Sequence, residues 1–199
     1  MHRVAMTQML DRVPDADVKR WPAIVETIAP ATDGPWIVGG SVRRLLDGLP
    51  QTSDVDVGFR DAEQLAAFVA RLTAAGFKQT GETPEYVGLS GKIGDATMAV
   101  QALRVTFGAR PEDVIDAFDF TICQFAFDGT DLVCGDFSLY DLARKRLAIH
   151  RITYAASTVR RMLKYGRQGY RFCQGTVVAI LEAVAKDPAV IHAAMEYVD

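Results

Sequence analysis

The chain has few of the residues that build disulfide scaffolds or zinc sites. Its 199 residues include three cysteines and three histidines, and the cysteines show neither Cys-x-x-Cys nor paired histidine spacing. An odd cysteine count without such spacing argues against both kinds of site and fits a reducing compartment. We therefore expect a cytoplasmic protein in which Cys123, Cys134 and Cys173 are buried and pack as small apolar side chains.

Long apolar runs are also missing. No run approaches the roughly 20 residues that cross a bilayer, and residues 1–17 lack the apolar core of a secretory signal. Apolar residues nevertheless make up 49% of the chain, which at this length is ample for a hydrophobic core. These features predict a soluble globular protein without a membrane partner.

Acidic residues are absent from one stretch near the C-terminus. Residues 142–181 hold nine of the 22 basic residues and none of the 25 acids, in a chain of net charge −3. This division predicts a positive surface for phosphate groups and an acidic remainder that can hold a divalent cation. The nine bases are Arg144, Lys145, Arg146, Arg151, Arg160, Arg161, Lys164, Arg167 and Arg171.

Hydrophobic periodicity predicts strands interspersed with helices, followed by helices alone. The expected strands are residues 36–38, 53–59, 85–89, 97–105 and 118–127. The expected helices are residues 15–29, 41–47, 62–75 and 111–117, and Pro22 suggests that the first of them starts near that residue. A mostly helical segment follows from residue 138, with a break at 147–153 and apolar stretches at 177–185 and 190–198. This order predicts a mixed α/β head, residues 1–150, and a helical tail, residues 151–199.

Two acids lie side by side on one expected strand. Residues at i and i+2 of a strand point to the same face, so Asp54 and Asp56 present adjacent carboxylates. Two close carboxylates repel each other, and a hard divalent cation relieves that conflict. Mg²⁺ favours a few carboxylates together with phosphate oxygens and water, so the pair is a candidate catalytic and metal site.

A glycine pair precedes this strand and opens a helix. Gly39 and Gly40 allow a ligand close to the backbone, and the helix expected from Ser41 offers unpaired N–H groups to a phosphate. Arg43 could add a charge-assisted contact. The joint order of a strand, a Gly-Gly-Ser turn, a helix and an Asp-x-Asp strand is more specific than any one part.

With these motifs, the chain resembles the head domain of the tRNA CCA-adding enzymes and bacterial poly(A) polymerases, in the DNA polymerase beta nucleotidyltransferase superfamily. The resemblance covers residues 34–172, and its motifs follow the family order: Val38-Gly39-Gly40-Ser41-Val42-Arg43, the Asp54–Asp56 strand, Ala117-Phe118-Asp119-Phe120-Thr121-Ile122-Cys123, the basic helix 158–165, and Gly169-Tyr170-Arg171-Phe172. It implies an α/β (α+β) nucleotidyltransferase head with a mixed sheet and a small helical C-terminal part.

The resemblance also implies an activity. A hydroxyl group would attack the α-phosphate of a nucleoside triphosphate such as ATP, with two Mg²⁺ ions bound by Asp54 and Asp56 and with pyrophosphate leaving. It further implies triphosphate contacts at Gly39, Gly40, Ser41 and Arg43, and a ribose contact near Asp119. Arg160 is what remains of the family's nucleotide-selecting template. With Lys164 it belongs to the basic segment, for which an RNA end of tRNA type is the leading acceptor.

The sequence departs from the family at several positions. Gln101 stands where a supporting Glu is expected, which leaves Asp95 and Asp119 as positional candidates for a third carboxylate. Arg44, Ala117, Phe118 and Cys123 replace family residues, and the long helical body that grips tRNA is missing. We therefore expect nucleotidyl transfer but not CCA addition. Two alternatives remain: a toxin-like transferase acting on a protein or small molecule, and a degenerate module that binds a nucleotide without turnover.

Overall fold

The computed structural model describes residues 1–7 and 20–191 and contains two compact units. The first unit comprises residues 1–117 and 123–136, and the second comprises residues 118–122 and the chain from 137 onward. The boundary at residue 150 that we expected from the sequence stays a prediction. Among the residues described, no helix is long and apolar enough to cross a membrane.

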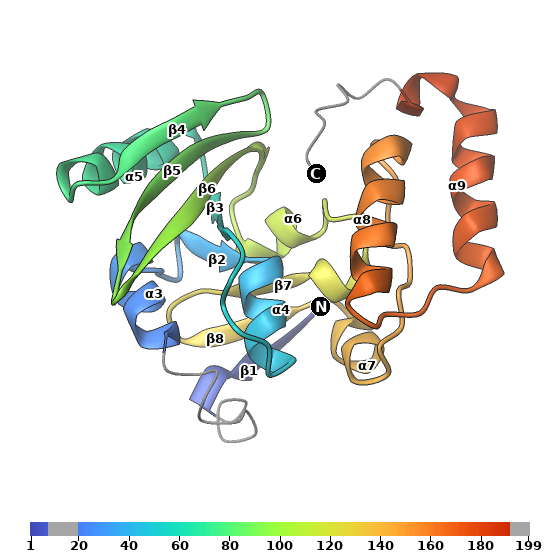
Figure 1. Ribbon diagram of the computed structural model, residues 1–199, viewed down its shortest axis with the longest axis horizontal. Coiled ribbons are helices and arrows are strands. Elements are labelled where there is room, and N and C mark those ends of the chain that lie inside the picture. Colours follow the sequence, from blue (N-terminus) through green and yellow to red (C-terminus); the bar gives the residue numbers. More distant parts are fainter. Residues whose placement is uncertain (8–19, 192–199) are drawn as a thin grey trace. The chain divides into compact units, whose positions relative to one another are not determined.

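An eight-stranded mixed sheet forms the first unit, in the order β1-β8-β7-β2-β3-β6-β5-β4 (Figure 1). Neighbouring strands run antiparallel except β3 and β6, which are parallel. The strands are β1 (His2–Ala5), β2 (Trp36–Val38), β3 (Val55–Phe59), β4 (Lys78–Glu82), β5 (Tyr86–Ile93), β6 (Ala96–Phe107), β7 (Phe125–Phe127) and β8 (Asp131–Cys134). The mixed α+β class expected from the sequence is confirmed.

Helices pack on both faces of this sheet. They are α3 (Trp21–Ile28), α4 (Gly40–Leu46), α5 (Ala62–Ala74) and α6 (Pro111–Ile115). On one face Phe59 of β3 meets Phe68 of α5, with ring centroids 5.1 Å apart. The next residue back, Gly58, points to the other face, where an added Cβ would lie 2.9 Å from Val114 of α6. Because side chains alternate along β3, its apolar residues Val55, Val57 and Phe59 face α5, and its even-numbered residues lie on the opposite face of the sheet.

Several sequence expectations hold for the first unit. Strand β2 and helix α5 lie where the periodicity places them, and α4 and β3 differ by one or two residues at their ends. The hairpin of β5 and β6 is longer than expected, because the polar segment from Ser90 to Ile93 continues β5. Helix α3 begins at Trp21, next to Pro22, and residues 15–19 of the expected helix 15–29 lie outside the described part.

Other expectations fail. The strand predicted over 118–127 is wrong: only Phe125–Phe127 is strand, and Thr121–Cys123 forms a 3₁₀ turn, η1. The chain bends there because the Asp119 carbonyl accepts hydrogen bonds from the backbone N–H groups of His150 and Arg151. The sequence reasoning also missed β1, β4 and β8.

The second unit is helical, with α7 (Ser138–Ala143), α8 (Ala155–Arg167), α9 (Gln174–Lys186) and the short 3₁₀ helix η2 (Pro188–Ile191). Its core includes Tyr165 of α8, which meets Phe120 and Tyr170 edge to face at 5.9 and 6.1 Å. Most of the expected apolar segment 190–198 lies outside the described residues. Cys123 and Cys134 are buried as expected, but Cys173 is exposed, because it directly precedes the first turn of α9.

Candidate active site

Asp54 and Asp56 lie together with Gln101 on the sheet face opposite α5. Asp56 of β3 pairs in parallel register with Gln101 of β6, and cross-strand neighbours share a face. Asp54 directly precedes β3 and points the same way as Asp56, two positions along. The Gln101 amide donates a hydrogen bond from Nε2 to Asp54 Oδ2 at 2.6 Å. Asp54 is exposed and Asp56 is half-buried, so both carboxylates are within reach of a ligand.

The glycine turn lies directly beside these carboxylates. Gly39 has φ 63° and ψ −120°, a conformation that strains any residue with a side chain. Its N–H donates to the Phe125 carbonyl at 2.8 Å, which ties the turn to β7. A Cβ added to Gly40 would lie 3.8 Å from Asp56 Oδ2. Glycine at this position therefore leaves open space next to the carboxylate.

Buried hydrogen bonds hold the backbone of Asp54 in place. The Ser41 hydroxyl donates to the Asp54 carbonyl at 3.2 Å, and the Gln51 amide donates to the Ser41 carbonyl at 3.0 Å. Ser41 and Gln51 are 0% and 3% exposed. Ser41 thus orients the carboxylate pair through the backbone. Nothing in the local pattern singles out Gln51, which follows Pro50 and resembles an ordinary loop residue.

The side chain of Arg43 is buried, although the sequence suggested a triphosphate contact for it. It is 2% exposed and interacts within the protein. Its backbone N–H donates to the Gly39 carbonyl at 3.0 Å and so closes the first turn of α4. Its contact with a phosphate stays a prediction.

The donor set suits Mg²⁺ in one of its usual modes. Across the described part of the chain, no three His, Cys, Asp or Glu side chains form a group that could hold a metal. A dedicated protein cage is therefore not built there. Mg²⁺, however, commonly binds through one or two carboxylates plus substrate phosphates and water, and Asp54 and Asp56 supply that number on an accessible face.

Asp95, one of the positional candidates for a third carboxylate, lies far from this pair. It is in the turn between β5 and β6, with its side chain 90% exposed and 3.6 Å from Arg20. Gln101 lies six positions further along the chain in β6, which at about 3.3 Å per residue corresponds to roughly 20 Å. The position expected to carry the third acid is Gln101 itself, beside Asp56.

The remaining sequence candidates belong to the second unit. Asp119 is 7% exposed, and one of its carboxylate oxygens lies 2.5 Å from Arg161 Nε. Burial raises the pKa of the Asp119 carboxyl, while the Arg161 guanidinium acts in the opposite direction. Arg160 and Lys164 are exposed on α8, four residues apart and hence on one side of the helix. Their roles toward a nucleotide stay predictions.

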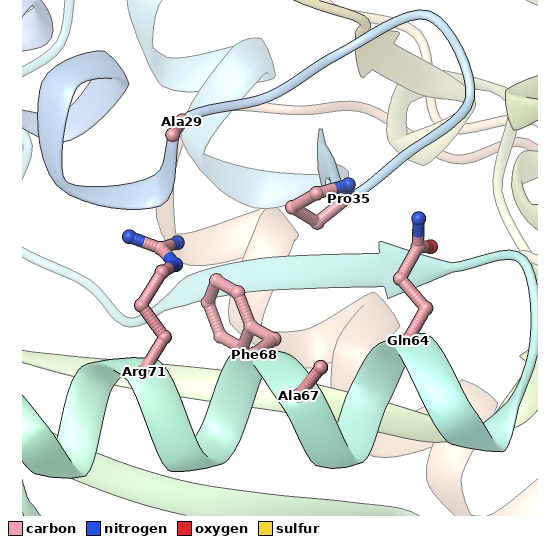
Figure 2. A pocket seen from close by; sticks show the side chains of 6 residues that line it. All are labelled: Ala29, Pro35, Gln64, Ala67, Phe68 and Arg71. Carbon is pink, nitrogen blue, oxygen red and sulfur yellow. The ribbon is translucent and has the colours of Figure 1, made fainter.

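A hollow on the other face of the sheet offers no comparable chemistry. Figure 2 shows it against α5, where Arg71 points to the end of α3 and lies with its guanidinium carbon 5.2 Å from the centre of the Phe68 ring. Arg71 donates to the carbonyls of Thr27 and Ile28 at 3.0 and 2.8 Å, and burial lowers its pKa. Its guanidinium thus caps α3. The lining residues are Ala29, Pro35, Gln64, Ala67, Phe68 and Arg71.

A sequence profile of the Gabija anti-defense 2 family matches residues 3–145, which is most of the chain. The chain belongs to the Gabija anti-defense 2 family. The match includes the glycine turn, the carboxylate pair and Gln101, so the candidate site lies within the residues that match the family profile. No curated protein sequence matches the chain.

Solved structures of CCA-adding enzymes are similar in fold to this Gabija anti-defense 2 family member. Apo form II of a CCA-adding enzyme matches with a TM-score of 0.61 at 16% identity, over 94% of this chain and 49% of that one. The same coverage of this chain is found for the Thermotoga maritima CCA-adding enzyme complexed with tRNA (TM-score 0.56, 18% identity, 46% of that chain). It is also found for a CCA-adding enzyme complexed with CTP (TM-score 0.59, 17% identity, 46% of that chain).

These similarities confirm the polymerase-beta-like nucleotidyltransferase fold that the motifs indicated. At such low identity, similarity shows the fold alone. The chain also spans only about half the length of the matching structures.

Proposed function

We propose that this chain is a divalent-metal-dependent nucleotidyltransferase that moves a nucleoside monophosphate from a nucleoside triphosphate to a hydroxyl group, with an RNA end of tRNA type as the acceptor. The observation that carries the proposal is the Asp54–Asp56 pair on an accessible sheet face, next to the open space at Gly40. The fold supports it, because a structure with this fold is a complex with CTP.

The proposed reaction forms one bond and breaks one. The acceptor hydroxyl gives its proton to solvent as its oxygen bonds to the α-phosphorus, while the bond from that phosphorus to the bridging oxygen of the β-phosphate breaks. The electron pair of the broken bond leaves with pyrophosphate. Mg²⁺ bound at Asp54 and Asp56 would neutralise charge on the attacking and leaving oxygens.

The protein's own groups position the carboxylate of Asp54 and leave space for a ligand beside Asp56. Ser41 and Gln101 fix the backbone and the carboxylate of Asp54 before a ligand arrives. Gly40 leaves the side of Asp56 open. Such preorganisation supplies much of the rate enhancement in phosphoryl transfer, where catalysis is mostly positioning and charge stabilisation.

The basic segment supports RNA as the acceptor. Residues 142–181 contain nine bases without an acid, and Arg160 and Lys164 are exposed on one side of α8. A structure with this fold is a complex with tRNA. If RNA binds there, its affinity falls steeply with salt, because each neutralised phosphate of a single strand adds about 0.7 to the slope of log K against log salt.

The family description favours a second candidate acceptor. The family is named for action against Gabija, so the same chemistry would modify a protein component of Gabija defence. The site requirements are unchanged, since a serine, threonine or tyrosine hydroxyl attacks phosphorus as a ribose hydroxyl does.

The experiment incubates the purified chain with Mg²⁺ and each of the four ribonucleoside triphosphates, with and without total RNA or Gabija proteins. Pyrophosphate release is measured, and the α-labelled acceptor is identified. We expect release that depends on Mg²⁺ and RNA and is lost when Asp54→Asn and Asp56→Asn are combined. Asp54 is exposed, Asp56 is only half-buried, and asparagine has nearly the same shape as aspartate, so this variant should still fold.

Asp95→Asn is the matched control, because it removes an exposed carboxylate roughly 20 Å along β6 from Gln101. It should keep full activity. Labelling of a Gabija protein instead of RNA would select the second candidate. Nucleotide binding without pyrophosphate release would leave a binding module, and activity that survives the double change would overturn the site assignment.

A further inference from the structure

Gln101 occupies a position that decides how much negative charge the candidate site carries. It stands beside Asp56 in the parallel register of β3 and β6, and its amide lies 2.6 Å from Asp54 Oδ2. The three side chains therefore form one cluster on one sheet face. A glutamate at position 101 would have nearly the same shape as glutamine but would make this a three-carboxylate cluster.

The amide changes the chemistry in two ways. It donates a hydrogen bond where a carboxylate would repel, so it holds Asp54 in place in the absence of any cation. It also keeps the cluster at two negative charges. The hydrogen bond from Gln101 uses one acceptor site of Asp54 Oδ2, and the remaining lone pairs of that carboxylate can still accept a ligand.

A cluster with this charge is a weak site for a bare divalent cation. Mg²⁺ gives up its water reluctantly and favours sites where substrate phosphates complete its coordination. Two carboxylates, one exposed and one half-buried, offer few ligands on their own. A triphosphate brings the missing oxygens and the missing negative charge.

We propose that Gln101 is a positioning residue that fixes Asp54 and keeps the free protein from capturing a divalent cation, so that the cation enters with the nucleoside triphosphate. The entry of the cation with the triphosphate rests on the proposed nucleotidyltransferase function, whereas the fixing of Asp54 by Gln101 does not. Gln101 acts through Asp54 rather than on the reacting atoms.

The test measures binding of Mn²⁺ alone to the full chain by electron paramagnetic resonance of the free ion. Wild type should bind Mn²⁺ weakly. Gln101→Glu should bind it roughly 10- to 100-fold more tightly, the range by which groups next to a metal site alter its affinity. Gln174→Glu is the control for added charge, because Gln174 is an exposed glutamine in the first turn of α9. It should leave Mn²⁺ affinity unchanged.

A second variant keeps the proposal testable if Gln101→Glu does not fold. Gln101→Leu removes the hydrogen bond to Asp54 and adds no charge. It should bind Mn²⁺ alone as weakly as wild type but should bind Mn²⁺ with CTP at least about tenfold less tightly. Asp54→Asn combined with Gln101→Glu should abolish the gain in Mn²⁺ affinity.

Two results would overturn the proposal. One is wild-type protein that binds Mn²⁺ alone as tightly as Gln101→Glu does, and the other is Gln101→Leu with wild-type affinity for Mn²⁺ with CTP. Failure of the proposed function gives a different pattern: Gln101→Glu still gains Mn²⁺ affinity through Asp54, but wild type neither binds a triphosphate nor releases pyrophosphate.

Discussion

Replacing Gly40 by alanine should strengthen the fold and weaken nucleotide binding at the same time. The added methyl carbon would lie 3.8 Å from Asp56 Oδ2, which is ordinary van der Waals contact. Gly40 begins α4 with a φ outside the left-handed range, so alanine fits its backbone. The methyl group thus fits without moving the protein, but it fills the space beside the carboxylate that a metal-bound phosphate would use.

The two effects differ in size as well as in sign. A glycine-to-alanine change at a compatible backbone position stabilises a protein by about 0.4–1 kcal/mol, because the unfolded chain loses freedom. For a chain of this length that raises the melting temperature by roughly 1–4 °C. Loss of one hydrogen bond to a charged phosphate costs about 1.5–3 kcal/mol, which corresponds to at least about a tenfold rise in the Kd for CTP with Mg²⁺.

Calorimetric titration with CTP and Mg²⁺, together with thermal unfolding, measures both effects on one preparation. Gly175→Ala is the matched control, since Gly175 also lies in the first turn of a helix and its added Cβ would contact only Cys173 Sγ, at 3.4 Å. It should gain stability and keep nucleotide affinity. Wild-type affinity in Gly40→Ala would show that no ligand approaches Asp56 from the glycine turn, and the site geometry proposed above would be wrong.

Two further predictions concern ion pairs within each unit. Arg3→Met should cost about 1–2 kcal/mol of unfolding free energy in urea titration, between the values for exposed and buried ion pairs. Arg3 donates to Asp128, which is 1% exposed, and to Glu112, but is itself 41% exposed. A loss below about 0.5 kcal/mol, the range of ordinary surface changes, would contradict this. Burial raises the pKa of Asp119 above its ordinary 3.8 despite Arg161. At pH values between the pKa of Asp119 in the unfolded state and its higher pKa in the folded state, the folded state therefore binds more protons. The free energy of unfolding should fall as pH rises through that range. Urea titrations from pH 3.5 to 7 should show this decline in wild type relative to Asp119→Asn, and a relative increase would reverse the sign of the shift.

The sequence alone predicted those elements whose apolar residues recur with the period of a strand or a helix. Val55, Val57 and Phe59 alternate with polar or small residues, and their burial follows directly from that period. The same local spacing placed Asp54 and Asp56 on one face. The order of the glycine turn, the helix and the Asp-x-Asp strand then indicated the fold, because it matches the motif order of a known family.

Elements held by distant partners could not be predicted in this way. All five residues of β4 are exposed, so no apolar period marks it. Strand β1 depends on Arg3, whose carboxylate partners lie 109 and 125 residues away in the sequence. The amide contacts of Gln51 and Gln101 likewise span 10 and 47 residues. Each of these is a tertiary contact that single-sequence periodicity does not encode.

The arrangement around Asp54 favours a cation-dependent function over a simple nucleotide-binding module. Asp54 is held by Ser41 through its carbonyl and by Gln101 through its side chain, and Asp56 lies two positions away. Adjacent carboxylates repel each other, so such fixation raises the free energy of the protein unless a cation offsets the charge. A module that binds a triphosphate without a cation would gain affinity from a neutral or basic residue at position 54 or 56, because the ligand is itself an anion. Two acids fixed in this orientation beside a glycine turn therefore fit the proposed cation-dependent transfer better than cation-free binding of a triphosphate.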